Sequence, residues 1–146
     1  MINNIKKKWL FFLSFGMALI VTSWLLYTSV SDLYKFNREV KLILEQNKRV
    51  EAVVIESYYI RRDPVTYWFR TEHGRKYYAK LLPSFKNPDI GEKLVILIAD
   101  NIKLCLIEDI KYKQILGYKY HLLYDIIISS LSLVFSIVML VITVEI

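Results

Sequence analysis

Cysteine, proline and glycine are scarce in this chain of 146 residues, which has one cysteine, three prolines and four glycines. Cys105 is the single cysteine, so it has no partner for an internal disulfide and the fold has no covalent cross-link. The four glycines are scattered along the chain, which excludes a glycine-rich loop that cradles a phosphate group.

The residues that usually carry catalysis or hold metals are also few. The two histidines, His73 and His121, fall in a predicted turn and at the start of an apolar segment, far apart in sequence. A zinc site needs about four N, S or O ligands, which these histidines and one cysteine do not supply. Cys105 falls on a predicted strand, where it is expected to act as a small hydrophobic residue. We therefore predict no enzyme activity, no metal, no cofactor and no small-molecule substrate.

Apolar residues are abundant instead, at 55% of the chain, and they concentrate at its two ends. The run from Trp9 to Val30 has no charged residue and, as a helix, extends about 33 Å, enough to cross a hydrocarbon core of about 30 Å. Three lysines precede it at positions 6–8. The run is longer than the apolar region of a signal peptide and lacks a small-residue cleavage site, so we expect an uncleaved anchor.

A second apolar segment extends from Leu122 to Val144 and has no charge after Asp125. Both segments carry small residues at helical spacing, which lets helix backbones approach closely and lets hydroxyl groups bond across. These predicted helix-packing residues are Ser14, Ala18, Thr22, Ser132 and Ser136. Their expected partner is the other helix or another protein, and a homo-oligomer is one form of this.

The residues after the first apolar segment form an amphipathic pattern. Apolar side chains recur on one helical face at Leu33, Phe36, Val40, Ile43 and Leu44, with charged residues between them. Two interpretations remain open at this point. The segment either continues the membrane helix into the juxtamembrane region or is a helix packed on the middle domain.

The middle of the chain changes to β-strand patterns. Five strands are predicted, at 50–60, 65–71, 75–82, 94–99 and 102–108. The second alternates, with Val65, Tyr67 and Phe69 on one face, and Gly74 supplies a positive φ for the following turn. The fourth is apolar throughout and is expected to be the most buried.

A single sheet of this size leaves one face uncovered, so a closed or strongly bent sheet is the better solution. We predict a membrane α+β protein in which two transmembrane helices flank a small antiparallel β-barrel-like or rolled-sheet domain of about five strands. The predicted segments are a basic tail (1–8), transmembrane helix 1 (9–30), a juxtamembrane amphipathic helix (31–48), the β-domain (49–119) and transmembrane helix 2 (120–144).

Several short motifs resemble those of bacterial two-helix membrane proteins carrying domain-of-unknown-function family 3592. The matching pieces are Val53-Val54-Ile55, Tyr67-Trp68-Phe69, Glu72-His73-Gly74-Arg75-Lys76-Tyr77 and the stretch from Gly91 to Asn101. Where the family has a Y-(D/N)-P turn, this chain has Ile98-Ala99-Asp100, without the proline. The resemblance implies two helices around a small β-domain and no particular activity.

Charge and aromatic content suggest a binding role. The formal net charge is +6, but the stretch 31–119 mixes 17 Lys/Arg with 12 Asp/Glu, which is too mild an excess to predict nucleic-acid binding. Tyrosine and tryptophan suit a protein interface or a membrane surface. The candidate contact residues are Tyr59, Tyr67, Trp68, Arg70 and Tyr78.

These features predict a non-enzymatic, membrane-anchored interaction module whose β-domain binds a partner protein or the membrane or envelope surface. Two alternatives are an immunity-type membrane protein that neutralises a toxin and an accessory subunit of a transporter or secretion complex. The lysines at 6–8 favour a multi-pass protein of the cell membrane with cytoplasmic N- and C-termini and an extracytoplasmic β-domain. Cations on the loop side of both segments argue for the opposite orientation.

Overall fold

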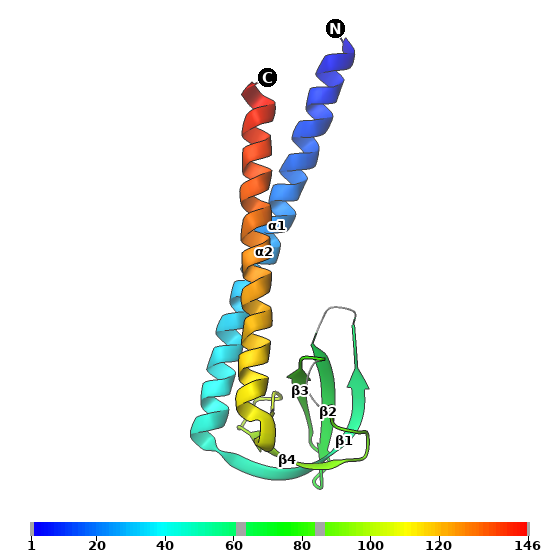
Figure 1. Ribbon diagram of the computed structural model, residues 1–146, viewed down its shortest axis with the longest axis vertical. Coiled ribbons are helices and arrows are strands. Elements are labelled where there is room, and N and C mark those ends of the chain that lie inside the picture. The colour runs from blue at the N-terminus through cyan, green and yellow to red at the C-terminus, as the bar shows by residue number, and fades with distance from the viewer. Residues whose placement is uncertain (1, 61–63, 84–86, 146) are drawn as a thin grey trace. The chain divides into compact units, whose positions relative to one another are not determined.

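The computed structural model describes residues 2–60, 64–83 and 87–145, with side chains between Trp9 and Thr143. Its elements are α1 (Ile2–Gln46), β1 (Lys48–Tyr58), β2 (Val65–Thr71), β3 (Lys76–Leu81), β4 (Lys93–Ile98), β5 (Leu106–Ile107), the short 3-10 helix η1 (Glu108–Ile110) and α2 (Lys111–Glu145) (Figure 1). The chain divides into two compact units. One is Tyr34–His121, called here the barrel unit, and the other combines the residues up to Leu33 with those from Leu122 onward.

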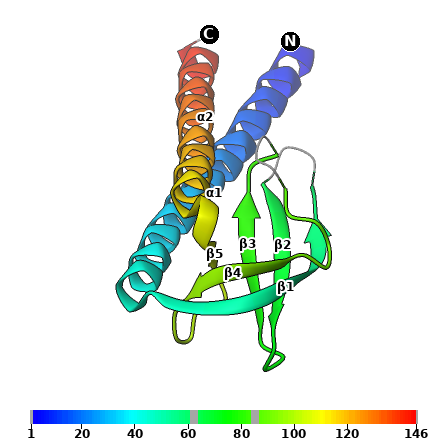
Figure 2. The same ribbon diagram turned by 60° about the horizontal axis from the view of Figure 1, so that its bottom comes forward.

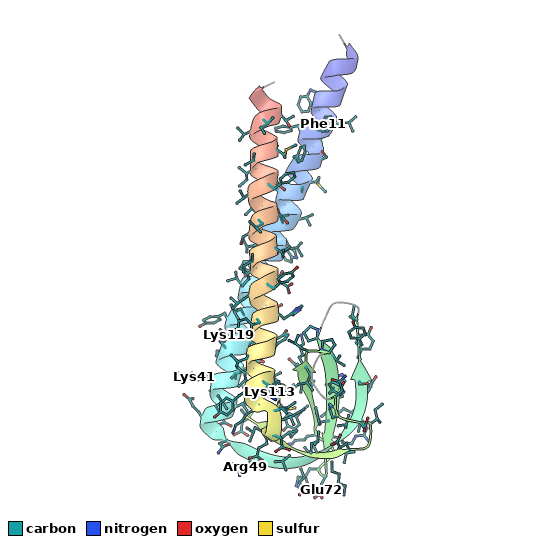
Figure 3. All side chains as sticks on the ribbon, viewed as in Figure 1. Phe11, Lys41, Arg49, Glu72, Lys113 and Lys119 are labelled. Carbon is teal, nitrogen blue, oxygen red and sulfur yellow. The ribbon has the colours of Figure 1, made fainter. Side chains whose placement is uncertain are left out.

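Among the residues that the structure describes, two helices are long and apolar enough to cross a membrane, judged by length and composition. Their large apolar side chains are mostly exposed, as at Trp9, Phe11 and Phe135, and Figure 3 shows Phe11 pointing outward from α1. Buried residues make up none of the most apolar window of α1 and 11% of that of α2. This pattern differs from the core helix of a soluble protein, whose apolar face is covered.

Helix α1 is longer than any segment predicted for it. It begins at Ile2, so the predicted basic tail is not separate from the helix, and it continues to Gln46. Asn47 then takes the left-handed conformation, with φ of 46°, and its N–H bonds to the Ile43 carbonyl oxygen at 2.9 Å. Asparagine tolerates this conformation better than most residues, which explains why the helix ends there.

The five strands form one sheet in the order β3-β2-β1-β4-β5, with antiparallel neighbours throughout. Strand β1 is central because it pairs with β4 from Lys48 to Val53 and with β2 from Ala52 to Tyr58. A bulge between Val54 and Glu56 marks where β1 bends from one pairing to the other. Figure 2 shows this curvature of β1 along β4 and then along β2.

The sheet curls until its two edges meet. Tyr78 on β3 and Leu104, just before β5, form a parallel bridge. In it the Tyr78 N–H donates to the Lys103 carbonyl, and the Cys105 N–H donates to the Tyr78 carbonyl, both at 2.8 Å. This single parallel bridge brings the first and last members of the order β3-β2-β1-β4-β5 together. The predicted rolled antiparallel sheet is therefore present.

The barrel core follows the alternation in the strands. In β2 every second side chain, including Tyr67 and Phe69, points inward, as the sequence predicted. The full core comprises Ala52, Val54, Val65, Tyr67, Phe69, Tyr77, Ala79, Leu81, Ile96, Cys105 and Ile107. The β2–β3 turn has the expected positive φ at Gly74, of 75°.

A second buried layer lies outside the barrel and involves the helix ends within the barrel unit. Leu97 and Leu106 are partners in the β4–β5 ladder and face away from the core, yet both are fully buried. The buried face of α1 in this unit consists of Phe36, Val40 and Ile43. Helix α1 therefore runs through this amphipathic segment without a break, and the apolar face of the segment is buried in the barrel unit, whereas its juxtamembrane position stays a prediction.

One buried polar side chain ties α2 to the barrel. The Gln114 side chain accepts a hydrogen bond from the Ile107 N–H at 2.9 Å and donates one to the Cys105 carbonyl at 3.0 Å. These two backbone groups flank the start of β5, which is only two residues long. The amide therefore completes the pairing that such a short strand cannot complete itself.

Three details of the sequence interpretation were wrong. The strand predicted at 102–108 is reduced to the bridge at Leu104 and the two-residue β5. Residues 111–119, predicted as part of the β-domain, are the first turns of α2, because η1 turns directly into this helix at Lys111. Strand β4 is not the most buried strand, since only Ile96 and Leu97 are buried in it, whereas β2 has four buried residues.

Replacing Gln114 with methionine tests the role of the buried amide, because it keeps a similar side-chain length and removes both hydrogen bonds. The Ile107 N–H and Cys105 carbonyl would stay buried without partners, so we expect the free energy of unfolding to fall by about 1–3 kcal/mol. Denaturation of the detergent-solubilised chain, followed by near-UV circular dichroism, measures this. The exposed neighbour provides the control, Lys113→Met, with a change within about 0.5 kcal/mol. Equal stability of the two variants would contradict the role.

Candidate binding surface

The outer face of the barrel carries most of the contact residues predicted from the sequence, but other parts of the chain cover some of this face. On β3 it is covered by the helix ends of the same unit. The Lys80 ammonium donates to the Tyr118 hydroxyl at 2.9 Å and lies 5.0 Å from that ring's centroid. The Tyr118 ring packs edge-on against Phe36 of α1, with centroids 4.7 Å apart. The chain thus uses this part of the barrel surface itself.

Trp68 and Tyr78 belong to the covered side. They are direct cross-strand partners on β2 and β3, with ring centroids 5.5 Å apart, and both are half-buried. Burial raises the pKa of the Tyr78 hydroxyl, and the nearby Glu39 carboxylate on α1 raises it further. Tyr78 is therefore a neutral, packed side chain at physiological pH.

The outer face over β1, β2 and β4 is open and holds a groove. Val53 lies at its centre, because the ladders pair it with Arg70 on β2 and with Lys93 on β4. The groove has a volume of about 330 Å³ and is lined by Glu51, Ala52, Val53, Ile55, Arg70, Thr71, Glu72 and Lys93. A cation thus lies on each side of an apolar floor.

The charged residues of the groove change from basic to acidic along the strands. Arg70 and Lys93 share the level of Val53. Glu51 and Glu72 lie closer to the β2–β3 turn, whereas Ile55 continues the apolar floor in the other direction, at the bulge. Arg49 and Glu72 in Figure 3 mark the end of the barrel to which the two acids belong. This arrangement suits an apolar side chain flanked by an acidic group.

The five predicted contact residues differ in position and exposure. Arg70 lines the groove, Tyr59 is exposed after the end of β1, and Trp68 and Tyr78 are half-buried. Tyr67 is 3% exposed in the barrel core, so its choice as a contact residue was wrong. Its inward position follows from the same alternation that placed Val65 and Phe69 together.

The sequence interpretation missed every groove residue except Arg70, and Val53, Ile55 and Lys93 are the ones that form the floor and one side of the groove. Val53 and Lys93 are far apart in sequence and meet through the register of β1 with β4. The signal available was the alternation in 50–60, which puts Val53 and Ile55 on the face opposite Ala52 and Val54. No pattern in the sequence gave the register.

The small residues predicted to pack the helices are unevenly placed. Ala18 and Thr22 are half-buried and Ser136 is buried, whereas Ser14 and Ser132 are exposed. The hydroxyl groups bond within their own helices, from Thr22 to the Ala18 carbonyl at 2.8 Å and from Ser136 to the Ser132 carbonyl at 2.9 Å. Such bonds satisfy the hydroxyl groups where no water is available. For Thr22 and Ser136, the predicted hydrogen bonds between helices are therefore replaced by bonds within one helix.

Cys105 is fully buried in the barrel core, and burial raises the pKa of its thiol far above the usual range. A thiol in this position is a packing group. Within the part of the chain that the structure describes, no group of three or more His, Cys, Asp and Glu side chains could hold a metal ion.

No protein-family model matches the chain, and no curated protein or solved structure does either. The resemblance to the two-helix membrane proteins of family 3592 therefore stays a prediction from sequence motifs.

Alanine substitutions at Tyr67 and Tyr59 test whether the first tyrosine lies in the core and the second on the surface. Tyr67→Ala removes a ring from the barrel core, and we expect the free energy of unfolding to fall by about 3–5 kcal/mol. Tyr59→Ala removes an exposed ring, and we expect a change within about 0.5 kcal/mol in detergent solution. Chemical denaturation of the two variants measures both values. A small loss for Tyr67→Ala would restore this residue as a surface candidate.

Proposed function

We propose that this chain is a non-enzymatic, membrane-anchored interaction module that binds a partner protein through the groove over β1, β2 and β4. Support comes from the way the chain uses its own surfaces. The helix ends cover the outer face of β3, through Tyr118 and Phe36, and leave the groove around Val53 open. The groove combines apolar and charged side chains, and the barrel that carries it is held by the helix ends. Such a surface can bind a partner protein without a catalytic group.

The chemistry of the groove favours an extended or helical segment with one apolar anchor and an acidic neighbour. Val53 and Ile55 offer the floor for the anchor, and Arg70 and Lys93 offer cations on its two sides. Arginine is enriched at the centre of interfaces because its planar group pairs with carboxylates and also stacks. Charge complementarity of this kind mainly sets specificity and the rate of association.

The membrane part of the proposal depends on the two apolar helices, each of which has the length and composition of a span. We place the protein in the cell membrane as a multi-pass protein. Following the lysines at 6–8, we place both termini in the cytoplasm and the barrel outside.

Site-specific photo-crosslinking in native membranes tests the groove. A photoreactive residue at Lys93 should form one discrete crosslinked product, and the same residue at Asn101, in the exposed turn after β4, should not. In a chain that carries a photoreactive residue at Ile55, the double charge reversal Arg70→Glu/Lys93→Glu should abolish the groove product, because it turns attraction for an acidic segment into repulsion.

The matched control for the charge reversal is Lys76→Glu, at an exposed position on β3, which should leave the product from Ile55 intact. Equal products from the Lys93 and Asn101 positions would show nonspecific proximity and overturn the groove as the binding site. A product that survives the double reversal would do the same.

Membrane orientation is tested by one added cysteine. His73 lies in the exposed β2–β3 turn, so His73→Cys should react with a membrane-impermeant maleimide in intact cells if the barrel is outside. The parent chain is the background control, because its buried Cys105 should stay unlabelled. Labelling only after lysis would place the barrel in the cytoplasm.

A further inference from the structure

Ile90 is a large apolar side chain that the barrel unit leaves exposed. Its exposed fraction is 68%, and it is the second residue of the tight turn 89–92, which leads into β4. One exposed isoleucine is ordinary on a protein surface, so its surroundings decide whether it has a role. Here the surroundings are unusual, because hydrogen bonds fix the turn that carries Ile90.

Three hydrogen bonds hold this turn. The Glu92 N–H donates to the Asp89 carbonyl at 3.0 Å, and the Asp89 N–H donates to the Glu92 carboxylate at 2.9 Å. Gly91 has φ of 90°, close to the positive value that the third residue of a type II turn requires. Its N–H donates to the Val54 carbonyl at 2.8 Å, which ties the turn to β1. Ile90 therefore has a defined position at the tip of a rigid turn.

Acidic residues flank Ile90 on both sides in the sequence. Asp89 precedes it and Glu92 follows two residues later, and both are exposed. The turn thus presents an apolar anchor with acidic neighbours, which is the chemistry that the groove over β1, β2 and β4 favours. A tight turn can present such an anchor in the same way as an extended or helical segment, and a rigid one loses less freedom on binding.

The anchor and the groove are adjacent but do not meet within one chain. The β1–β4 ladder ends at the pair Val53 and Lys93, which is the middle of the groove, and the bond from Gly91 to Val54 follows directly. Ile90 itself is not a lining residue of the groove. Two adjacent, complementary surfaces allow a two-fold pair, in which each copy inserts its turn into the groove of the other.

We propose that the partner in the groove is a second copy of this chain, whose Ile90 inserts between Arg70 and Lys93 of the first copy. The inference rests on the proposed function, because it names the occupant of the same groove. The acids of the turn face the two cations, and the contact occurs twice in the symmetric pair. Exposed ion pairs add little to affinity, so the isoleucine anchor supplies most of it and the charges set the specificity.

Photo-crosslinking between two differently tagged copies tests the proposal in native membranes. The first copy carries one tag and a photoreactive residue at Ile55, in the floor of the groove, and the second copy carries only the other tag. We expect a product that contains both tags and has twice the mass of the 17.4 kDa chain. Ile90→Lys in the second copy should lower this product several-fold, because it removes the anchor and adds a charge that Arg70 and Lys93 repel.

Two further substitutions in the second copy serve as controls. Ile60→Lys makes the same change at another exposed isoleucine of the barrel unit and should leave the two-tag product intact. Ile90→Val keeps a branched apolar side chain at the tip of the turn and should also retain it. Equal products from the Ile90→Lys and Ile60→Lys copies would overturn the assignment of Ile90 as the anchor.

The composition of the product separates failure of this inference from failure of the proposed function. A discrete product that contains the first tag and a different protein, without the second tag, would leave the groove as a binding site and overturn its occupation by a second copy. If neither Ile55 nor Lys93 gives any discrete product, the groove is not a binding site and both proposals are wrong.

Discussion

The barrel depends on the hydrogen bonds that the Gln114 side chain makes to the short strand β5. A strand of two residues cannot pair all of its backbone groups with one neighbour, and Leu104, just before it, forms the bridge to β3. The amide of Gln114 reaches from α2 to the Ile107 N–H and the Cys105 carbonyl, all in a buried region. Since an unpaired buried backbone group costs as much as a lost hydrogen bond, closing the barrel requires the start of α2.

This requirement explains which parts of the fold the sequence could predict. Strand β2 was predicted at its observed bounds, because strict alternation and the turn glycine Gly74 are both local signals. The segment 102–108 alternates equally well but forms only β5 and one bridge, because it is divided between two partners. Alternation reports which side chains point inward and carries no information about how many neighbours a strand has.

The candidate surface was less predictable than the fold for the same reason. Tyr67 was chosen for its chemistry, although its phase with Phe69 put it on the inward face. Trp68 and Tyr78 do face outward, but Tyr118 and Phe36 come from segments distant in sequence and lie over that side of the barrel. The groove could not be predicted because Val53 and Lys93 meet only through the strand register.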